Sequence, residues 1–313
     1  MGRTPIASVV VPVTVRAPAK VNLHLGVGPL RADGFHDLAT VFQAVSLYDE
    51  VTVSEADELV VEVEGEGADV VPTDSSNLAA KAVIAMADYI GRDPHVAISI
   101  NKGIPVAGGM AGGSADAAAA LIGCDALWQT NLGHEGLHEL AARLGSDVPF
   151  CLIGGTALGA GRGDQLTTVL GRGSYHWVFA LADGGLSTPA VYRELDRIRS
   201  EIPAVELDMP QELLSALRTG DARRLAPWLS NDLQAAAFQL KPGLRRTIEA
   251  GRDANALAAI VSGSGPTCAF LAAGEAEAIA LVAALSGSGA CRAVRRAHGP
   301  VAGARVVAST TPA

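Results

Sequence analysis

The sequence predicts an α+β fold in two domains, and two observations support this prediction. The first third of the chain contains short segments of β-branched residues between turn residues, which is typical of strands. Beyond it, helical patterns alternate with short apolar strands, and the character of the chain changes near residues 171–185. We therefore expect sheets flanked by helices on one side, in an amino-terminal domain of residues 1–175 and a carboxy-terminal domain of residues 176–313.

Each expected element follows from a local pattern of residues. Strands are expected where β-branched residues lie between turn signals, at residues 9–16, 41–47, 51–53, 59–63, 95–100, 150–158 and 166–170. Helices are expected at residues 77–90, 114–128 and 134–144, and the second of them is apolar enough to be buried. The second domain is expected to contain a strand at 177–181, several helices between 189 and 251, and a β-loop-β-α-β-β series from 256 to 308.

The charge of the chain restricts its possible ligands. The 313 residues include 33 Asp and Glu against 24 Lys and Arg, which gives a net charge of −9. Binding to nucleic acid generally needs a basic surface, so a polyanionic ligand must instead meet a local positive field. No segment has the roughly 18 uninterrupted apolar residues of a membrane span. We expect small-molecule ligands, no nucleic-acid or membrane partner, and a monomer or homodimer.

The cysteines and the amino terminus bear on the compartment. Four cysteines are scattered among apolar or small residues: Cys124, Cys151, Cys268 and Cys291. This spacing suggests neither a zinc framework nor a disulfide scaffold, so we expect a reducing cytoplasm. Residues 6–19 imitate a secretory signal with an A-x-A cleavage site, which is the alternative. Pro12, Thr14 and the abundant valines fit a first strand better.

A glycine-rich loop separates the expected strand at 95–100 from the expected helix at 114–128. Residues 105–116 read P-V-A-G-G-M-A-G-G-S-A-D, with four glycines within six residues. Such a backbone can approach an anion closely, and the free N–H groups at the start of the next helix favour a phosphate. We expect Ser114 at the N-cap, where its hydroxyl serves the helix, a phosphate or Mg²⁺. A plain strand-to-helix turn is the alternative, although it needs only one or two glycines.

Three charged residues are candidates for chemistry. Lys20 and Asn22 share one face of the extended segment after the first strand, where a solvated strand end is the alternative explanation. Asp147 lies between a helix end and an apolar segment, so it either caps a turn or acts as a general base. Lys102 precedes the glycine-rich loop, as a nucleotide contact or an ordinary exposed charge. A second glycine-rich segment at 262–267 could close over phosphates.

One motif is misleading. Residues 134–138 read H-E-G-L-H and fit the H-E-x-x-H signature of zinc metalloproteases. Gly136 interrupts the segment at a helix start, and Ala141 and Leu144 stand where the extended motif has Gly and His. We expect solvated residues of a first helical turn here, and no metal ligands from the protein.

Taken together, these segments resemble the GHMP kinase superfamily of small-molecule kinases. The matching segments span nearly the whole chain in the family's order: residues 18–23, 31–36, 77–78, 104–116, 144–150, 187–189, 231–232 and 262–265. The sequence departs from the family pattern in three places. Phe35 stands where Tyr is common, Met110 and Ala111 replace Leu-Gly, and Ala115 replaces a frequent Ser. None of these changes removes a group that the chemistry needs.

The resemblance implies a fold and an activity. The amino-terminal domain would resemble ribosomal protein S5 domain 2, the carboxy-terminal domain would be ferredoxin-like, and the active site would lie in the cleft between them. The activity would be phosphoryl transfer from ATP to the 2-hydroxyl of a cytidine-diphospho sugar alcohol, in non-mevalonate isoprenoid precursor synthesis. A related kinase for mevalonate, homoserine or galactose is the first alternative. A nucleotide-sensing or nucleic-acid-binding module without chemistry is the second.

The resemblance also implies which residues bind ATP. Asn77 and Lys102 would lie at the adenine side. The phosphates would be cradled by the loop and the first helical residues after it: Pro105, Val106, Ala107, Gly108, Gly109, Met110, Ala111, Gly112, Gly113, Ser114 and Ala115. Mg²⁺ would be bound mainly through the ATP phosphates.

The acceptor site is implied in the same way. Asp147 would take the proton of the hydroxyl group, and Lys20 would keep Asp147 ionised and stabilise the developing charge. A cytosine slot would be formed by His36 with Phe35 and Tyr192. Further substrate contacts would come from Asn22, Thr188 and Asp147.

Overall fold

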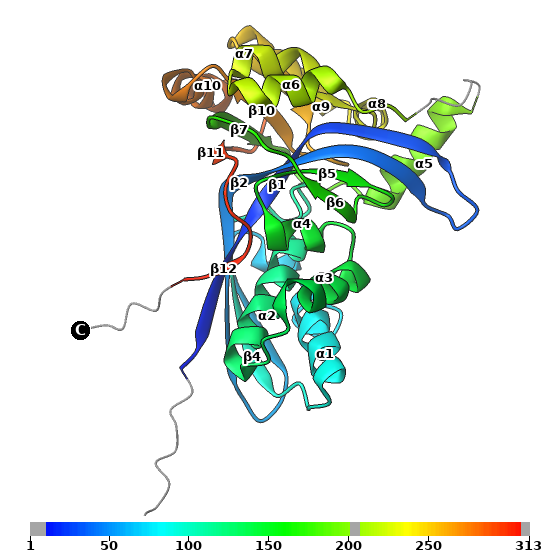
Figure 1. Ribbon diagram of the computed structural model, residues 1–313. Helices are drawn as coiled ribbons and strands as arrows, with labels where there is room; N and C mark the ends of the chain where they lie inside the picture. The colour runs from blue at the N-terminus through cyan, green and yellow to red at the C-terminus, as the bar shows by residue number, and fades with distance from the viewer. Residues whose placement is uncertain (1–10, 201–206, 308–313) are drawn as a thin grey trace, which may run out of the picture.

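The computed structural model describes residues 11–200 and 207–307, which form two sheets in adjoining halves of the molecule (Figure 1). Over these residues the larger sheet has eight strands and the smaller sheet has four. The predicted α+β class is therefore confirmed. The start of the strand expected at residues 9–16 lies outside the described residues. Within the two described stretches, no helix has the length and apolar character needed to cross a membrane.

Two long antiparallel strands, β1 (Val13–Leu30) and β2 (His36–Glu55), run through the larger sheet (Figure 1). The expectation of separate strands at 41–47 and 51–53 is wrong, because β2 continues through the residues between them. The register shifts where Pro18 lies opposite Tyr48, so a bulge is present there. Pro18 has no N–H to donate to the ladder, and a bulge bends a strand without ending it.

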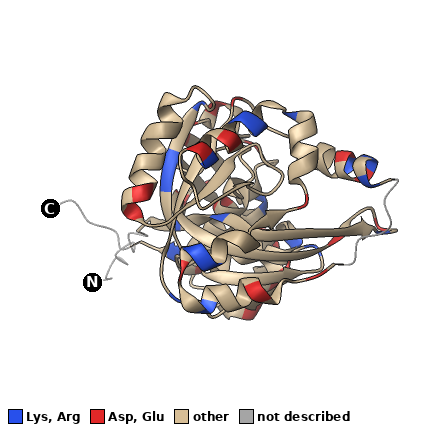
Figure 2. Ribbon diagram, turned by 90° about the horizontal axis from the view of Figure 1, so that it is seen from above, with Lys and Arg blue, Asp and Glu red and all other residues tan. Residues whose placement is uncertain are grey.

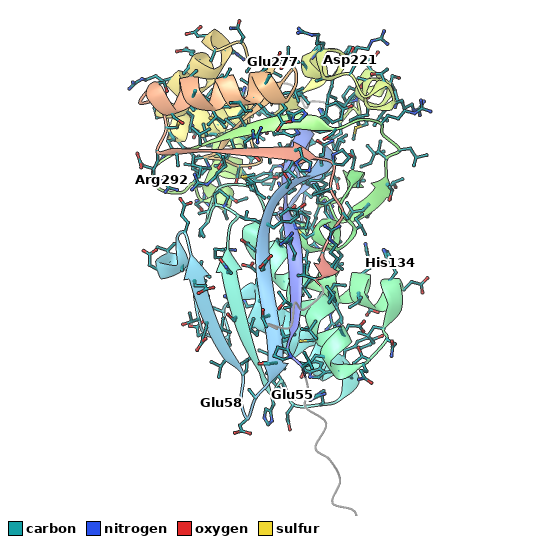
Figure 3. The ribbon with its side chains drawn as sticks, turned by 90° about the vertical axis from the view of Figure 1, so that its left-hand side faces the viewer. Glu55, Glu58, His134, Asp221, Glu277 and Arg292 are labelled. Carbon is teal, nitrogen blue, oxygen red and sulfur yellow. The ribbon has the colours of Figure 1, made fainter. Side chains whose placement is uncertain are left out.

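The helices of the amino-terminal half pack on one side of the larger sheet, as the view in Figure 3 shows. Their bounds are α1 (Leu78–Ile90), α2 (Gly112–Trp128), α3 (Gly133–Leu144) and α4 (Val148–Ile153). The other strands of this half are β3 (Val60–Gly65), β4 (Val96–Lys102), β5 (Thr156–Ala160) and β6 (Gln165–Thr168), and η1 (Ala68–Val70) is a short 3-10 turn. Ala115 and residues 117–120 of α2 are fully buried, and α2 packs on α1 and on the strands β1 and β2, which confirms the predicted buried helix.

The segment at residues 150–158 differs from the expected strand. Residues up to Ile153 belong to α4, and only the end of the segment lies in β5. Pro149 fits the first turn of a helix, where its missing N–H costs nothing, and Gly154 and Gly155 end the helix with positive φ angles of 62° and 66°. A short apolar run has no period that separates a buried helix from a buried strand.

The carboxy-terminal half is built on the smaller sheet, in the order β11-β7-β10-β9 with all neighbours antiparallel. Its strands are β7 (Tyr175–Leu181), β9 (Ala258–Val261), β10 (Cys268–Ala272) and β11 (Ala293–Gly299). Its helical segments are α5 (Thr188–Arg199), α6 (Gln211–Thr219), α7 (Ala222–Leu225), η2 (Ala226–Trp228), α8 (Gln234–Leu240), α9 (Gly243–Asp253) and α10 (Glu275–Gly287). This confirms the helices expected between 189 and 251 and the strand–helix series that follows.

The two halves are joined by more than the connecting chain. The strand β8 (Ser230–Asn231) pairs in parallel with β1, and β12 (Arg305–Val306) pairs with β1 near its start. Trp177 on β7 packs into the same hydrophobic core as the strands of the larger sheet, and its indole Nε1 donates to Gln43 Oε1 at 3.0 Å. The strand β1, which carries Lys20, is therefore held by segments from both halves.

Candidate active site

A cavity of about 470 Å³ opens beside β1, between the two glycine-rich segments. Its walls come from both halves of the molecule, because residues near the start of α5 and in the loop before β10 line it together with the amino-terminal loop. Of the residues expected in the site, it is lined by Lys20, Asn22, Asn77, Lys102, residues 105–113, Asp147, Thr188 and Tyr192. Ser114 and Ala115 lie beneath this lining, in the first turn of α2.

Lys20 and Asp147 meet at this cavity. Lys20 Nζ lies 3.7 Å from Asp147 Oδ2, and the backbone N–H of Lys20 donates to the carbonyl oxygen of Met110 in the glycine-rich loop at 3.1 Å. Lys20 is only 5% exposed, so it is not a solvated strand end. The reason is that β1 continues ten residues beyond it, to Leu30, and does not end there. Asp147 makes no side-chain cap to α4, which leaves its carboxylate facing the cavity.

The ammonium of Lys20 is also held by an oriented amide. Lys20 Nζ donates to Asn22 Oδ1 at 2.7 Å, and Asn22 Nδ2 donates to Thr40 Oγ1 at 2.9 Å. The hydroxyl of Thr40 in turn donates to the carbonyl oxygen of His24 at 2.7 Å. Because Thr40 gives its proton to His24, it must accept from Asn22, and this fixes the amide with its oxygen toward Lys20.

The glycine-rich loop leads into α2 earlier than the sequence predicts. The helix begins at Gly112 with Ala111 at the N-cap, so the expectation that Ser114 is the N-cap is wrong. Ser114 lies in the first turn, where its N–H is among the groups that lack a partner within the helix. Ala111 adopts the left-handed conformation with φ 63°, which turns the chain into the helix directly at the glycine pair.

The two glycine-rich segments lie against each other. Gly109 has φ +73°, and a Cβ there would lie 2.3 Å from the carbonyl oxygen of Ser262, so only glycine fits. The Ser262 hydroxyl donates to the Gly109 carbonyl oxygen at 3.3 Å. Asn231 fixes the second segment, since its Nδ2 donates to the carbonyl oxygens of Val261 and Gly263 at 2.7 Å each. The second segment thus forms a wall of the first cavity beside the glycine-rich loop at 105–113.

Lys102 is part of a buried cluster of charges. Its Nζ donates to Asp49 Oδ2 at 2.5 Å and to Asp116 Oδ2 at 2.6 Å, and the lysine is 5% exposed. The alternative of an ordinary exposed charge is therefore wrong. Asp49 Oδ1 accepts from the backbone N–H groups of Gly103 and Ile104 at 2.8 Å each, whereas Asp116 Oδ1 is buried and has no hydrogen-bond partner.

Two carboxylates share one ammonium in this cluster. Burial raises the pKa of Asp116 to about 8, although Lys102 opposes this shift. Burial works against the Lys102 ammonium, but the charges of Asp116 and Asp49 outweigh it and raise the pKa of Lys102. Asp49 accepts two backbone hydrogen bonds in addition to that from Lys102, whereas Asp116 Oδ1 accepts none, so burial of Asp116 is compensated by Lys102 alone and its pKa rises.

Asn77 lies at the far wall of the same cavity. Its Oδ1 accepts from the backbone N–H of Ala79 at 2.8 Å, which caps α1, and its Nδ2 donates to the carbonyl oxygen of Pro72 at 2.7 Å. Both ends of the amide are thus used to shape the chain from Pro72 to the helix start. The predicted helix over 77–90 is confirmed by this cap.

A second cavity of about 600 Å³ contains the aromatic residues expected to form a cytosine slot. The rings of His36 and Tyr192 lie 5.2 Å apart and 31° from parallel. His36 is buried, and its Nδ1 donates to the carbonyl oxygen of Gly28 at 2.8 Å, which fixes the ring. Phe35 is 52% exposed at the mouth of this cavity. Burial raises the pKa of Tyr192, so its phenol stays protonated.

The two cavities adjoin each other. Five residues line both of them: Leu38, Ser146, Arg162, Thr188 and Tyr192. The Thr188 hydroxyl lies 2.9 Å from that of Ser264, which ties α5 to the second glycine-rich segment at this junction. A ligand that fills the second cavity with a flat ring can therefore extend toward the Lys20–Asp147 pair.

The H-E-x-x-H segment takes no part in this site. It begins α3, and His134 lies at the outer margin of the molecule (Figure 3). The rings of His134 and His138 have centroids 6.0 Å apart. Among the described residues, no group of three or more His, Cys, Asp and Glu is placed to hold a metal ion.

Sequence reasoning missed three charged residues of the site. Asp49 and Arg162 lie in segments with no local pattern that marks them, and only the fold brings them to the cavities. Asp116 did carry a signal, because it is a carboxylate within the otherwise apolar helix expected at 114–128. A charge in a buried helix calls for a partner, and here that partner is Lys102.

Comparison with known proteins identifies the family. The model of the GHMP kinases N terminal domain matches residues 77–155, and that of the GHMP kinases C terminal matches residues 213–291. A 4-diphosphocytidyl-2-C-methyl-D-erythritol kinase of Nocardia farcinica is 62% identical over 296 residues, which cover 95% of this chain and 96% of the relative. The enzyme of the same name from Mycobacterium tuberculosis is 59% identical over 299 residues, 96% of this chain and 94% of its own.

Solved structures agree with this assignment. A crystal structure of 4-(cytidine 5'-diphospho)-2C-methyl-D-erythritol kinase has a TM-score of 0.74 at 31% identity, covering 91% of this chain and 98% of its own. A homoserine kinase from Cytophaga hutchinsonii has a TM-score of 0.74 at 17% identity over 97% of this chain and 100% of its own, which shows a shared fold alone. The chain therefore belongs to the GHMP kinases and, within them, to the family of 4-diphosphocytidyl-2-C-methyl-D-erythritol kinases.

Proposed function

We propose that this protein transfers the γ-phosphoryl group of ATP to the 2-hydroxyl of 4-diphosphocytidyl-2-C-methyl-D-erythritol, in non-mevalonate isoprenoid precursor synthesis. The observation that carries this proposal is the Lys20–Asp147 pair, with Nζ and Oδ2 3.7 Å apart in the wall of the first cavity, next to Ser146, which lines both cavities. The names of the 59–62% identical relatives support it. Mevalonate and homoserine kinases share the fold, but these activities and a galactose type of kinase have less support for this chain.

Asp147 is the general base in this proposal. As the substrate hydroxyl oxygen forms its bond to the γ-phosphorus, the bond from that phosphorus to the β–γ bridging oxygen breaks and ADP leaves. The hydroxyl proton passes to the Asp147 carboxylate, and such a base contributes about 10²–10⁴ in rate. Lys20, held by Asn22, stabilises the charge that develops on the transferred group.

ATP occupies the first cavity in this proposal. Its phosphates lie against the glycine-rich loop and the free N–H groups of the first turn of α2, with Ser114 among them. Mg²⁺ enters with ATP and is held mainly through its phosphates. The adenine lies toward Asn77 and Lys102, and the Lys102 ammonium has one N–H left after its two carboxylate partners.

The acceptor occupies the second cavity. Its cytosine ring stacks between aromatic side chains of Phe35 and Tyr192, and His36 faces its polar edge. Thr188, Asn22 and Asp147 contact the part of the substrate that reaches the first cavity. Phe35 and His36 of the amino-terminal half and Tyr192 of α5 then determine which base fits the slot.

We also propose a fold type for each of the two domains, residues 1–175 and 176–313. We propose an amino-terminal domain like ribosomal protein S5 domain 2 and a ferredoxin-like carboxy-terminal domain, with the active site in the cleft between them. The order β11-β7-β10-β9, which places the last strand beside the first, supports the ferredoxin-like part. The free thiols of the four cysteines fit a reducing cytoplasm.

A substrate comparison tests the function. The purified protein is incubated with MgATP and, in separate reactions, 4-diphosphocytidyl-2-C-methyl-D-erythritol, mevalonate, homoserine or galactose, and the phosphorylated product is detected by mass spectrometry. We expect turnover of the cytidine-diphospho substrate alone. Turnover of one of the other three, without the first, would overturn the proposal.

The base is tested by Asp147→Asn. We expect kcat to fall by about 10²–10⁴, with ATP affinity nearly unchanged, because the amide cannot take the proton but keeps the shape of the site. Asp88→Asn, on the exposed side of α1, is the matched control and should leave kcat as it is. An Asp147→Asn variant with full kcat would remove Asp147 from the role of base.

A further inference from the structure

The acceptor of the proposed reaction carries a diphosphate between its cytosine and its sugar alcohol. If the ring fills the slot at His36 and the hydroxyl reaches Asp147, the diphosphate must lie where the two cavities join. A chain with a net charge of −9 must offer such an anion a local positive field, from basic side chains or from backbone N–H groups. The question is which side chain provides it.

Among the described residues, four basic side chains line the two cavities: Lys20, Lys102, Arg162 and Arg193. Lys102 is committed to two buried carboxylates, and Lys20 sits beside Asp147 at the reacting atoms. Arg193 lines the second cavity but not the first. Of the arginines, Arg162 lines both cavities, and so it is placed at their junction.

The position of Arg162 is set by the turn between β5 and β6. Its guanidinium lies over the ring of Phe35, 5.4 Å from the centroid, and its Nη2 lies 3.3 Å from Asp164 Oδ2. The backbone of this turn is fixed, because the N–H of Leu38 on β2 donates to the Gly161 carbonyl oxygen at 2.7 Å. One of the five guanidinium N–H groups is used by Asp164, which leaves donors for another anion.

We propose that Arg162 binds the diphosphate of the acceptor and thereby selects a cytidine diphosphate over an uncharged cytidine. A planar guanidinium matches two phosphate oxygens at once, and its stacking on Phe35 keeps that plane in place. Because Phe35 also borders the cytosine slot, one aromatic ring holds the base on one side and the phosphate-binding side chain on the other. This inference rests on the proposed function and names the residue that recognises the negative charge of the substrate diphosphate.

The test compares two ligands that differ only in the diphosphate. Dissociation constants of CDP and cytidine are measured by calorimetry for the wild-type protein and for Arg162→Gln, Arg162→Lys, Arg193→Gln and Arg197→Gln. We expect Arg162→Gln to weaken CDP about tenfold or more while cytidine changes less than twofold, since hydrogen bonds to charged groups are the strong ones. Arg162→Lys should recover part of the loss. Arg197, paired with Glu194 on the outer side of α5, is the matched control and should change neither constant.

The enzyme reaction gives a second readout. Arg162→Gln should raise KM for the cytidine-diphospho acceptor by a similar factor, with little change in kcat and in KM for ATP. An equal loss for CDP and cytidine would make Arg162 a support for Phe35 only, and a CDP-selective loss in Arg193→Gln alone would assign the role to Arg193. Either result overturns the inference. A wild-type protein that does not turn over the acceptor refutes the proposed function instead, whereas normal turnover with an unchanged KM in Arg162→Gln refutes this inference alone.

Discussion

Lys20 is a buried ammonium whose neighbours are an amide oxygen and one carboxylate, Asn22 and Asp147. Its backbone contacts the glycine-rich loop, but its side chain points to the Asp147 side of the cavity. The phosphates of ATP are expected to rest on backbone N–H groups that Lys20 does not provide. In the proposed mechanism, Lys20 therefore acts in phosphoryl transfer and contributes little to the binding of ATP.

We expect Lys20→Ala to reduce transfer to background while the dissociation constant of ATP changes by less than about tenfold, or about 1.4 kcal/mol. Turnover and ATP titration on the same preparation measure both. Lys81→Ala, on the exposed side of α1, is the control for the loss of a lysine. A larger loss of ATP affinity would make Lys20 a nucleotide ligand.

Asp116 predicts a pH dependence of stability. Burial raises its folded-state pKa to about 8 from the ordinary 3.8, so between these values the folded state holds a proton that the unfolded chain has lost. The free energy of unfolding contributed by this group therefore falls as the pH rises through this window. We expect Asp116→Asn to unfold with a shallower pH dependence between pH 5 and pH 8 than the wild type in urea titrations. The same slope in both proteins would show that Asp116 is ionised throughout.

At the scale of elements, the contact between the two glycine-rich segments is the tightest part of the site. In Gly109→Ala the new methyl group would meet the Ser262 carbonyl oxygen, and the backbone would be strained at φ +73°. We expect a loss of about 1–3 kcal/mol in unfolding free energy, measured by thermal and urea denaturation, and weaker ATP binding.

Gly113→Ala is the matched control for stability. This residue lies in the first turn of α2, and no atom lies within 4 Å of the position a Cβ would take. Alanine is the better helix former, so the melting temperature should stay or rise. Equal destabilisation by the two substitutions would mean that the segments do not press on each other at Gly109.

The sequence predicted the helices and strands that are marked by nearby capping residues or by a clear hydrophobic period. The cap at Asn77 and the glycine after α1 mark a helix that any environment would favour, and the strand–helix series after residue 256 follows from short periodic segments. The single strand β2 was missed because residues 48–50, Tyr-Asp-Glu, interrupt the β-branched run, although in the fold they pair with residues 16–18 of β1. The helix α4 was missed because an apolar run of six residues has no diagnostic period.

The site could be predicted only where its residues lie in recognisable segments. Lys20, Asp147 and the glycine-rich loop stand in such segments, and the fold places them together. Asp49 reaches Lys102 from 53 residues away, and Arg162 reaches Phe35 from a turn with no motif of its own. Such pairs depend on the sheet register, which a single sequence does not reveal.

For the whole molecule, the ion pairs of Glu66 connect the halves. Glu66 lies between β3 and η1, and its two carboxylate oxygens accept from Arg292 Nη1 and Arg295 Nη2 at 2.6 Å each. Arg292 lies at the edge of the carboxy-terminal half that faces this turn (Figure 3). The hydrogen bond from Arg292, then that from Arg295, lowers the pKa of Glu66 despite some burial. Neighbouring Gly67 packs toward Val106 of the glycine-rich loop, so this bridge lies beside the first cavity.

We expect Glu66→Gln to lower the unfolding free energy by no more than about 1 kcal/mol in dilute buffer, because all three side chains are 38–45% exposed and solvent screens them. The difference from wild type should vanish in about 1 M NaCl, and also as the pH falls through the lowered pKa of Glu66. Glu58→Gln, at an exposed turn (Figure 3), is the control. A difference that survives high salt would point to packing instead of charge.

Charge on the outer helices is mixed and not sorted by sign. In Figure 2 the helix that leads into the grey trace at the right, α5, carries blue and red segments in alternation. Its inner side contributes Thr188, Tyr192 and Asp196 to the second cavity, while Glu194 and Arg197 form an ion pair on the outer side. The charge on the outer side of α5 is therefore largely neutralised by this pair.

The strand β12 lies hydrogen-bonded beside the start of β1, with Arg305 opposite Arg16 and the N–H of Val307 donating to the Thr14 carbonyl oxygen at 2.9 Å. The polypeptide thus closes on itself almost like a ring. A circular permutant, spliced across this seam and opened instead at the exposed turn around Glu58, would keep every strand neighbour. Because such a permutant has the same strand pairing, we expect it to keep the geometry of the site although its chain starts at a different residue.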